Sequence, residues 1–140
     1  MMKKHTAYAV WKGSIKGGNG TLTTNSKVFD GQQYSFKTRF EDGTGTNPDE
    51  LLAATHAGCF AMALSLILGH AGFTPTLLDV KADITMDPEK LELSGSHLTL
   101  KATIPGIDKS KFLECAQAAK DNCPISKALK IPISLDAILV

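Results

Sequence analysis

The stretch from residue 47 to residue 68 constrains the fold of this chain more than any other part. Asn47 is a favourable N-cap, Pro48 suits the first helical position, and two acidic residues follow in the first turn. Residues 51–68 are then apolar nearly all round, and they approach the length of a membrane span. Three polar residues and many small residues interrupt the stretch, which favours a helix buried between sheets over a bilayer span. We expect a central core helix that closes near Gly69 and Gly72, and no membrane association.

Strand-like and helical segments alternate in blocks on both sides of this helix. The expected elements are strands at 6–12, 20–25 and 34–40, the central helix, strands at 77–86 and 91–104, helices at 108–120 and from 123, and a strand at 131–140. This order predicts an α+β fold with mainly antiparallel sheets around a long buried central helix. A single domain over residues 1–140 is expected, because independent cores run to about 100 to 150 residues. A helix this apolar also suggests a homodimer.

Composition excludes several classes of function. Fifteen basic residues balance fourteen acidic ones, and aromatic residues make up 6%, so no basic or stacking surface for nucleic acid is expected. The first six residues include two lysines but no continuous apolar stretch of the kind found in a signal peptide, which predicts a cytoplasmic protein. Three cysteines are too few for a disulfide scaffold, so any disulfide should be transient.

Two of the cysteines, Cys59 and Cys123, are the best clue to function. They lie 64 residues apart and neither belongs to a C-x-x-C motif, so the fold must bring them together if they act as a pair. Cys59 lies in the apolar helix, where a lone cysteine is most often a packing residue. Cys123 precedes Pro124 and suits an N-cap position, where free N–H groups favour a thiolate, although a purely structural cap is equally consistent. Cys115 has no local activator, and we assign it to the core.

Arg39 is the only arginine in the chain and the obvious candidate to activate a thiol. On the expected strand its side chain points away from Tyr34, Phe36 and Phe40. The purely structural interpretation is a solvent-exposed cation at the edge of the strand. Glu50 is the nearest candidate partner, although a capping box with Asn47 explains it fully. On one helix Glu50 and Cys59 are separated by about 13 Å of rise and about 180° of rotation. If both serve one site, we expect them to come from different subunits.

His56 precedes Cys59 by three residues and in principle forms a nucleophilic Cys-His pair with it. No acid is spaced to orient the imidazole, so a buried, hydrogen-bonded histidine is the stronger interpretation. The four histidines are too dispersed to predict a metal site with the cysteines.

Several stretches together resemble the OsmC/Ohr family of hydroperoxide-reducing proteins over nearly the whole length. An arginine in the third strand segment, away from the start of the chain, makes the sequence more similar to the osmotically inducible OsmC branch than to the Ohr branch. The stretches that carry the resemblance are Thr38-Arg39-Phe40, Gly45-Thr46-Asn47-Pro48-Asp49-Glu50-Leu51, Ala57-Gly58-Cys59-Phe60-Ala61-Met62-Ala63-Leu64, Pro105-Gly106-Ile107-Asp108 and Cys123-Pro124-Ile125-Ser126.

The resemblance implies a thiol peroxidase of the oxidative-stress response. Cys59 would be the peroxidatic cysteine, and Cys123 would capture its sulfenic acid as a disulfide. Arg39 and Glu50 would form an ion pair that supports the reacting centre. The resemblance also implies an intertwined homodimer with two interface sites and a dithiol reductant, which is of the lipoyl type in part of the family. No metal or organic cofactor is implied. We expect the apolar wall for an organic hydroperoxide to come from Phe36, Phe40, Phe60 and Met62.

Two other classes of function remain open at this point. A cysteine-dependent acyl or thioester hydrolase would use Cys59 with His56 and would not need Cys123. A non-catalytic stress protein that binds apolar ligands would use all three thiols for packing.

Overall fold

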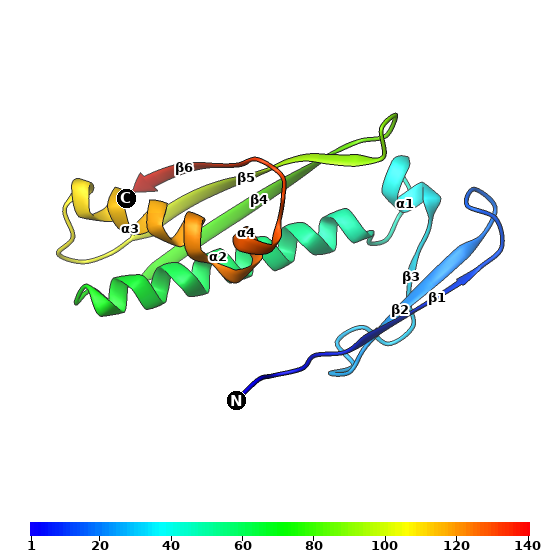
Figure 1. The fold of residues 1–140 in the computed structure, drawn as a ribbon, viewed down its shortest axis with the longest axis horizontal. Helices are drawn as coiled ribbons and strands as arrows, with labels where there is room; N and C mark the ends of the chain where they lie inside the picture. Colours follow the sequence, from blue (N-terminus) through cyan, green and yellow to red (C-terminus); the bar gives the residue numbers. More distant parts are fainter. The chain divides into compact units, whose positions relative to one another are not determined.

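The computed structural model describes residues 1–140, which form two compact units, Met1–Leu51 and Leu52–Val140. The first unit contains strands β1 to β3 and helix α1, and the second contains strands β4 to β6 and helices α3 and α4 (Figure 1). Helix α2 begins in the last residues of the first unit and continues through the second. The α+β class with mainly antiparallel pairing is confirmed, whereas a single domain over the whole chain stays a prediction.

The first unit is built on an antiparallel sheet in the order β1-β2-β3. Strands β1 (Ala7–Lys12) and β2 (Asn19–Thr24) form the predicted hairpin, and β3 (Gln32–Tyr34) pairs with β2. Gly20 of β2 lies beneath the rings of Trp11 and Tyr34, and a Cβ there would come within 2.5 Å of the tyrosine ring. Glycine is therefore required for these two rings to pack together over β2.

The expected strand at residues 34–40 is wrong beyond its first residue, because the chain turns into helix α1 (Phe36–Phe40). Ser35 is the N-cap of this helix and forms a capping box with Thr38: the Ser35 hydroxyl accepts from the Thr38 N–H, and the Ser35 N–H donates to the Thr38 hydroxyl. The alternation of polar and aromatic residues suggested a strand, but the local side-chain bonds favour a helical turn. Arg39 consequently lies on the same side as the aromatic residues, with its guanidinium 5.6 Å from the centre of the Phe40 ring.

The second unit is a mixed sheet covered on one face by helices. Strands β4 (Leu77–Asp87) and β5 (Glu92–Thr103) form the second predicted hairpin, and β6 (Ile133–Leu139) pairs with β5 in parallel. Helices α2 (Pro48–His70) and α3 (Lys109–Asn122) lie on one side of this sheet, and α4 (Pro124–Ala128) follows α3 (Figure 1). The buried core lies between the helices and the inward side chains of the strands. It contains Phe60, Leu64, Leu68, Leu98, Leu100, Ala102, Ile104, Phe112, Cys115, Ala116 and Ala119.

The starts of α2, α3 and α4 were predicted correctly. Asn47 accepts a hydrogen bond from the Glu50 N–H at 2.9 Å at the start of α2, and Asp108 accepts one from the Lys111 N–H at 2.8 Å at the start of α3. Pro124 occupies the first turn of α4, with Cys123 as its N-cap.

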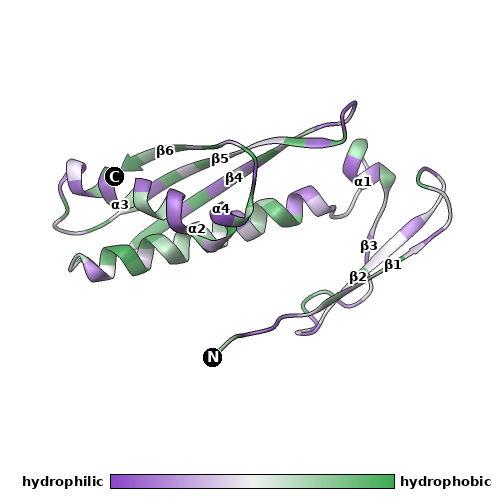
Figure 2. Cartoon of the chain, in the orientation of Figure 1, coloured by the Kyte–Doolittle hydropathy of each residue, from purple (hydrophilic) through white to green (hydrophobic).

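Helix α2 is less enclosed within the chain than its composition suggested. One stripe of residues spaced by four, namely His56, Phe60, Leu64 and Leu68, is buried. Other apolar residues remain open to solvent, including Met62 at 77% and Leu66 at 61% exposure, and Figure 2 shows apolar colour along much of the helix. By length and composition α2 could cross a membrane, but its buried stripe contributes Phe60, Leu64 and Leu68 to the core of the second unit.

Candidate functional site

Cys59 and Cys123, which are far apart in the sequence, meet in the second unit. The thiol of Cys59 lies near the side chain of Cys123 and the backbone N–H of Ile125, the second residue of α4, and both act on its pKa. All three cysteines are free thiols. The fold of a single chain therefore brings these two cysteines near each other.

The surroundings of Cys59 have opposing effects on its pKa. Burial, together with the neighbouring Cys123 thiol, raises the pKa of Cys59 above its ordinary value, while the Ile125 N–H lowers it. Burial is the largest of these effects, so the second unit by itself holds Cys59 mainly as the neutral thiol. An activated thiolate at this position requires a further positive group.

Cys123 is fully buried and tied to Ser126. Its sulfur accepts a hydrogen bond from the Ser126 N–H at 3.3 Å and lies 3.1 Å from the Ser126 hydroxyl oxygen. Cys115, in contrast, is packed among the core residues of α3, in agreement with its assignment from the sequence.

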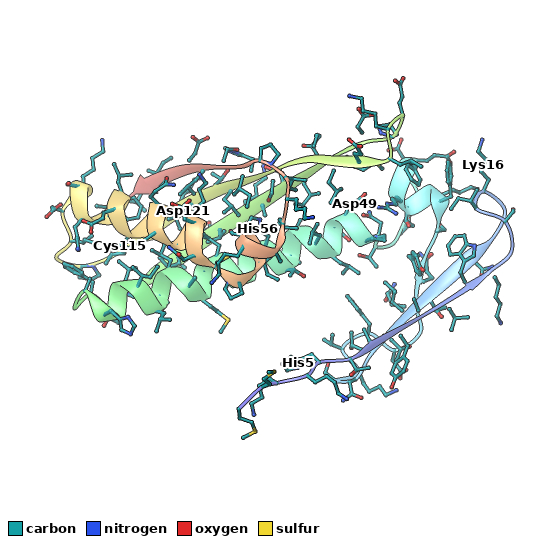
Figure 3. All side chains as sticks on the ribbon, in the orientation of Figure 1. His5, Lys16, Asp49, His56, Cys115 and Asp121 are labelled. Carbon is teal, nitrogen blue, oxygen red and sulfur yellow. The ribbon has the colours of Figure 1, made fainter.

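His56, labelled in Figure 3, is fully buried, and both of its ring nitrogens have serine partners. Nδ1 lies 2.7 Å from Oγ of Ser96 on β5, and Nε2 lies 2.8 Å from Oγ of Ser126 on α4. The expectation of a buried, hydrogen-bonded histidine is confirmed. Burial lowers the pKa of His56, which keeps the imidazole neutral near pH 7. The sequence offered a signal for Ser126, which follows the capping Cys123 by three residues, but none for Ser96.

Arg39 forms an ion pair with Asp49 and not with Glu50. Its Nε and one terminal nitrogen donate to the two carboxylate oxygens of Asp49 at 3.1 and 3.0 Å, in the bidentate geometry that guanidinium favours. The carboxylate of Glu50 instead accepts a hydrogen bond from the Thr46 hydroxyl at 2.7 Å. Within one chain Arg39 therefore pairs with Asp49, and the implied Arg39–Glu50 pair stays a prediction for the assembled protein. The sequence reasoning missed Asp49, which lies in the same first turn of α2 and was equally available.

Arg39 also lines an apolar pocket of about 260 Å³ in the first unit. Phe36 and Phe40, both expected at an apolar wall, are among its lining residues, and Trp11, Tyr34 and Pro48 extend the wall. The other two expected wall residues lie elsewhere. Phe60 is fully buried in the core of the second unit, and Met62 is exposed on α2.

The described side chains include no group of three or more histidine, cysteine, aspartate or glutamate residues placed to hold a metal ion. The chemistry of this arrangement rests on thiols, a buried imidazole–serine network and a carboxylate-bound guanidinium.

Comparisons with known proteins agree with the fold and with the motifs. A model of the OsmC-like protein family matches residues 41–137. The chain is 50% identical over 130 residues to a protein of Escherichia coli named peroxiredoxin OsmC, with 91% of each chain covered. It is 30% identical over 123 residues to the organic hydroperoxide resistance protein OhrB of Bacillus subtilis, covering 85% of this chain and 88% of that one.

Solved structures share the fold at lower identity. An OsmC-like protein of unknown function from Vibrio cholerae superimposes with a TM-score of 0.72 at 13% identity, covering 98% of this chain and 100% of that one. The family model spans more than half of the sequence, and the fold extends over nearly all of it. This chain belongs to the OsmC-like family.

Proposed function

We propose that this protein is a cysteine-based peroxidase that reduces organic hydroperoxides to alcohols. The observation that carries the proposal is the contact of Cys59 with both the Cys123 side chain and the Ile125 N–H. The names of two relatives, peroxiredoxin OsmC and organic hydroperoxide resistance protein OhrB, support the same class of activity.

In the first step the thiolate of Cys59 attacks the terminal peroxide oxygen. The O–O bond breaks, the alcohol leaves, and Cys59 becomes a sulfenic acid. Because the pKa of Cys59 is raised within its own unit, a nearby cation is needed to stabilise the thiolate. Arg39 is the proposed cation. Its guanidinium would stabilise the thiolate and the charge that develops on the leaving oxygen. Asp49 supports this role by fixing the direction of the guanidinium. Glu50 stays a candidate for the same supporting role in the assembled site.

In the second step Cys123 attacks the sulfenic acid, and a Cys59–Cys123 disulfide forms with release of water. Interaction between the two thiols in the reduced chain supports this step, because a disulfide forms only between cysteines that the fold holds close together. A dithiol then reduces the disulfide. We propose a reductant of the lipoyl type in the cytoplasm, where the protein would act in the defence against oxidative and osmotic stress.

The apolar pocket beside Arg39 supports a preference for organic hydroperoxides over hydrogen peroxide. An alkyl or aryl group buried against Phe36, Phe40 and Trp11 gains hydrophobic stabilisation that a bare peroxide cannot gain.

We further propose that the working protein is an intertwined homodimer with two shared sites. The outward face of α2 carries Ala54, Gly58, Met62 and Leu66, all exposed in the single chain. Space around Gly58 is open, so the glycine is not required by the packing of its own chain. The first unit buries only Gly20 and Thr38, which is little for an independent three-stranded sheet. A second copy of the chain would cover the outward face of α2 and the exposed side chains of the first unit.

Consumption of cumene hydroperoxide by the purified protein, with dihydrolipoamide as reductant, tests the proposal. The wild type should turn over, Cys59→Ser should be inactive, and Cys115→Ala should retain activity as a matched thiol control. Hydrogen peroxide should be reduced at least about 10-fold less efficiently, because it lacks an apolar group. Activity in Cys59→Ser would contradict the mechanism. Equal efficiency with both peroxides would contradict the substrate preference.

The hydrolase alternative is not favoured by the site, because both ring nitrogens of His56 have serine partners. Ester hydrolysis that survives Cys123→Ser and disappears in His56→Ala would restore it. Thiols that stay unmodified by cumene hydroperoxide would instead favour the non-catalytic ligand-binding alternative.

A further inference from the structure

A buried hydrogen-bonded chain connects His56 to the sulfur of Cys123 through one serine. His56 and Cys123 are fully buried, and Ser96 and Ser126 are 1% and 7% exposed. The atoms follow one another as Ser96 Oγ, His56 Nδ1, His56 Nε2, Ser126 Oγ and Cys123 Sγ, with separations of 2.7 Å, 2.8 Å and 3.1 Å between residues. All four residues belong to the second unit, on α2, β5 and the start of α4.

A neutral imidazole has one donor and one acceptor, so the chain has two consistent directions. In one, Ser96 donates to Nδ1, Nε2 donates to Ser126, and the Ser126 hydroxyl donates to the Cys123 sulfur. In the other, the Cys123 thiol donates to Ser126, Ser126 donates to Nε2, and Nδ1 donates to Ser96. The second direction leads from the Cys123 thiol to the unprotonated Nε2 of His56, which accepts the hydrogen bond of Ser126.

We propose that His56 is a positioning residue that acts through the Ser126 hydroxyl to deprotonate and orient Cys123 for disulfide formation. This inference rests on the proposed peroxidase function and adds a role for two residues to its second step. In the second direction Nε2 of His56 is unprotonated and hydrogen-bonded to Ser126, which places an acceptor at the end of the chain that begins at the Cys123 thiol.

The step balances as follows. The Cys123 proton moves to Ser126 Oγ while the Ser126 proton moves to His56 Nε2, leaving a thiolate that accepts hydrogen bonds from both the N–H and the hydroxyl of Ser126. The thiolate attacks the sulfenic sulfur of Cys59, the S–S bond forms, and the S–O bond breaks with loss of hydroxide. The proton held by His56 returns to solvent, so the net product is one water. The Cys59 sulfur is reduced and the Cys123 sulfur is oxidised.

The groups around the network are mostly uncharged. The partners of His56 on β5 and α4 are serine hydroxyls, and Cys59 on α2 is the other titratable group beside Cys123. On its outer side Ser126 lines an open depression of about 300 Å³ together with Lys120 and Asp121 of α3. This depression brings solvent close to the serine, where a proton can be exchanged.

Two measurements on variants of the whole chain test the inference. The variants are Ser126→Ala, which removes the hydroxyl but keeps the N–H bond to Cys123, His56→Gln, which cannot take up a proton, and Ser126→Thr, which restores a hydroxyl. Ser134→Ala is a matched control, because its hydroxyl lies 2.6 Å from His97 Nδ1 in a separate serine–histidine pair. Circular dichroism and the unfolding midpoint establish that each variant folds.

Rapid-quench mass spectrometry after one equivalent of cumene hydroperoxide separates sulfenic acid formation from disulfide formation. Ser126→Ala and His56→Gln should form the sulfenic acid at a rate within about 2-fold of wild type and the disulfide at least about 10-fold more slowly, because general-base assistance is lost. Ser126→Thr should recover most of the disulfide rate, and Ser134→Ala should match the wild type. Disulfide formation at the wild-type rate in both Ser126→Ala and His56→Gln would overturn the inference.

The second measurement does not depend on peroxidase activity. In a Cys59→Ser, Cys115→Ala background Cys123 is the only thiol, and its ionisation is followed by thiolate absorbance at 240 nm against the same protein lacking Cys123. Adding Ser126→Ala or His56→Gln should move the titration of Cys123 to higher pH. An unchanged titration would overturn the inference, because His56 would then have only a structural role. If Cys59 fails to react with peroxide, the proposed function fails, while this titration still decides whether His56 acts on Cys123.

Discussion

At the scale of single residues, Cys59 depends on groups that favour and disfavour its ionised form. Burial and the Cys123 thiol raise its pKa, and the Ile125 N–H lowers it. Below its pKa the thiolate fraction increases about 10-fold per pH unit, so the rate of the first step should rise with pH from 6 towards the pKa. Because Cys123 is one of the groups that raise this pKa, Cys123→Ala should shift the profile to lower pH. Stopped-flow oxidation by cumene hydroperoxide measures both effects, and a flat profile from pH 6 to 9 would contradict them.

The acid that orients Arg39 is a second question at this scale. Asp49 binds the guanidinium through two hydrogen bonds, while Glu50 is engaged by Thr46. Asp49→Asn should therefore lower kcat/KM by about 10-fold, since a positioned charge–charge pair is lost. Glu50→Gln is the matched control and should cost less than about 3-fold, because its partner is a neutral hydroxyl. Steady-state kinetics with cumene hydroperoxide decides between them. A larger loss of kcat/KM in Glu50→Gln than in Asp49→Asn would contradict this prediction and assign the supporting role to Glu50.

At the scale of elements, the buried network ties α2 to β5 and α4, and it makes stability depend on pH. The pKa of His56 is lowered in the fold, so below about pH 6.5, the ordinary histidine value, the unfolded chain binds more protons than the folded one. Folding stability should then fall as the pH drops from 6.5 towards the lowered pKa, by up to about 1.4 kcal/mol per pH unit. Urea unfolding at pH 7 and pH 5.5 measures this fall.

His56→Gln should remove most of this fall, whereas His97→Gln, which alters a histidine outside the network, should keep it. An equal loss of stability on acidification in wild type and His56→Gln would show that other groups control the acid sensitivity.

Elements with strong local signals could be predicted from the sequence, and those decided by a few side-chain bonds could not. The start of α2 is encoded in Asn47 and Pro48, and both hairpins are encoded in alternation around turn residues. Helix α1 was predicted as a strand, because its aromatic residues alternate while the Ser35–Thr38 capping box is a weaker signal. A parallel partner for β5 was also not predictable, since pairing across the chain depends on how α3 and α4 cross the sheet.

The same distinction applies to the site. The Cys123 cap was visible from the adjacent proline, and its contact with Cys59 followed from the resemblance to the family. The choice of Asp49 over Glu50 depends on side-chain directions in one helical turn, which spacing alone does not resolve. Ser96 lies 40 residues from His56, and only the fold brings them together.

At the scale of the whole molecule, the proposed shared site makes activity a property of two chains. Cys59→Ser and Arg39→Ala subunits should each be inactive as homodimers. If Arg39 serves Cys59 of the other subunit, a heterodimer of the two variants contains one intact site and should recover about half of the wild-type activity. Co-expression with two affinity tags isolates the heterodimer for a peroxidase assay. Activity no higher than that of the homodimers would contradict sharing.

The central claim is that two thiols from distant parts of the sequence form one redox pair. The most direct measurement treats the reduced wild type with one equivalent of cumene hydroperoxide and maps its peptides by mass spectrometry under non-reducing conditions. We predict a Cys59–Cys123 disulfide within seconds, with Cys115 left as a free thiol in the core. Unmodified Cys59 and Cys123 after minutes, or a disulfide that includes Cys115, would contradict the account.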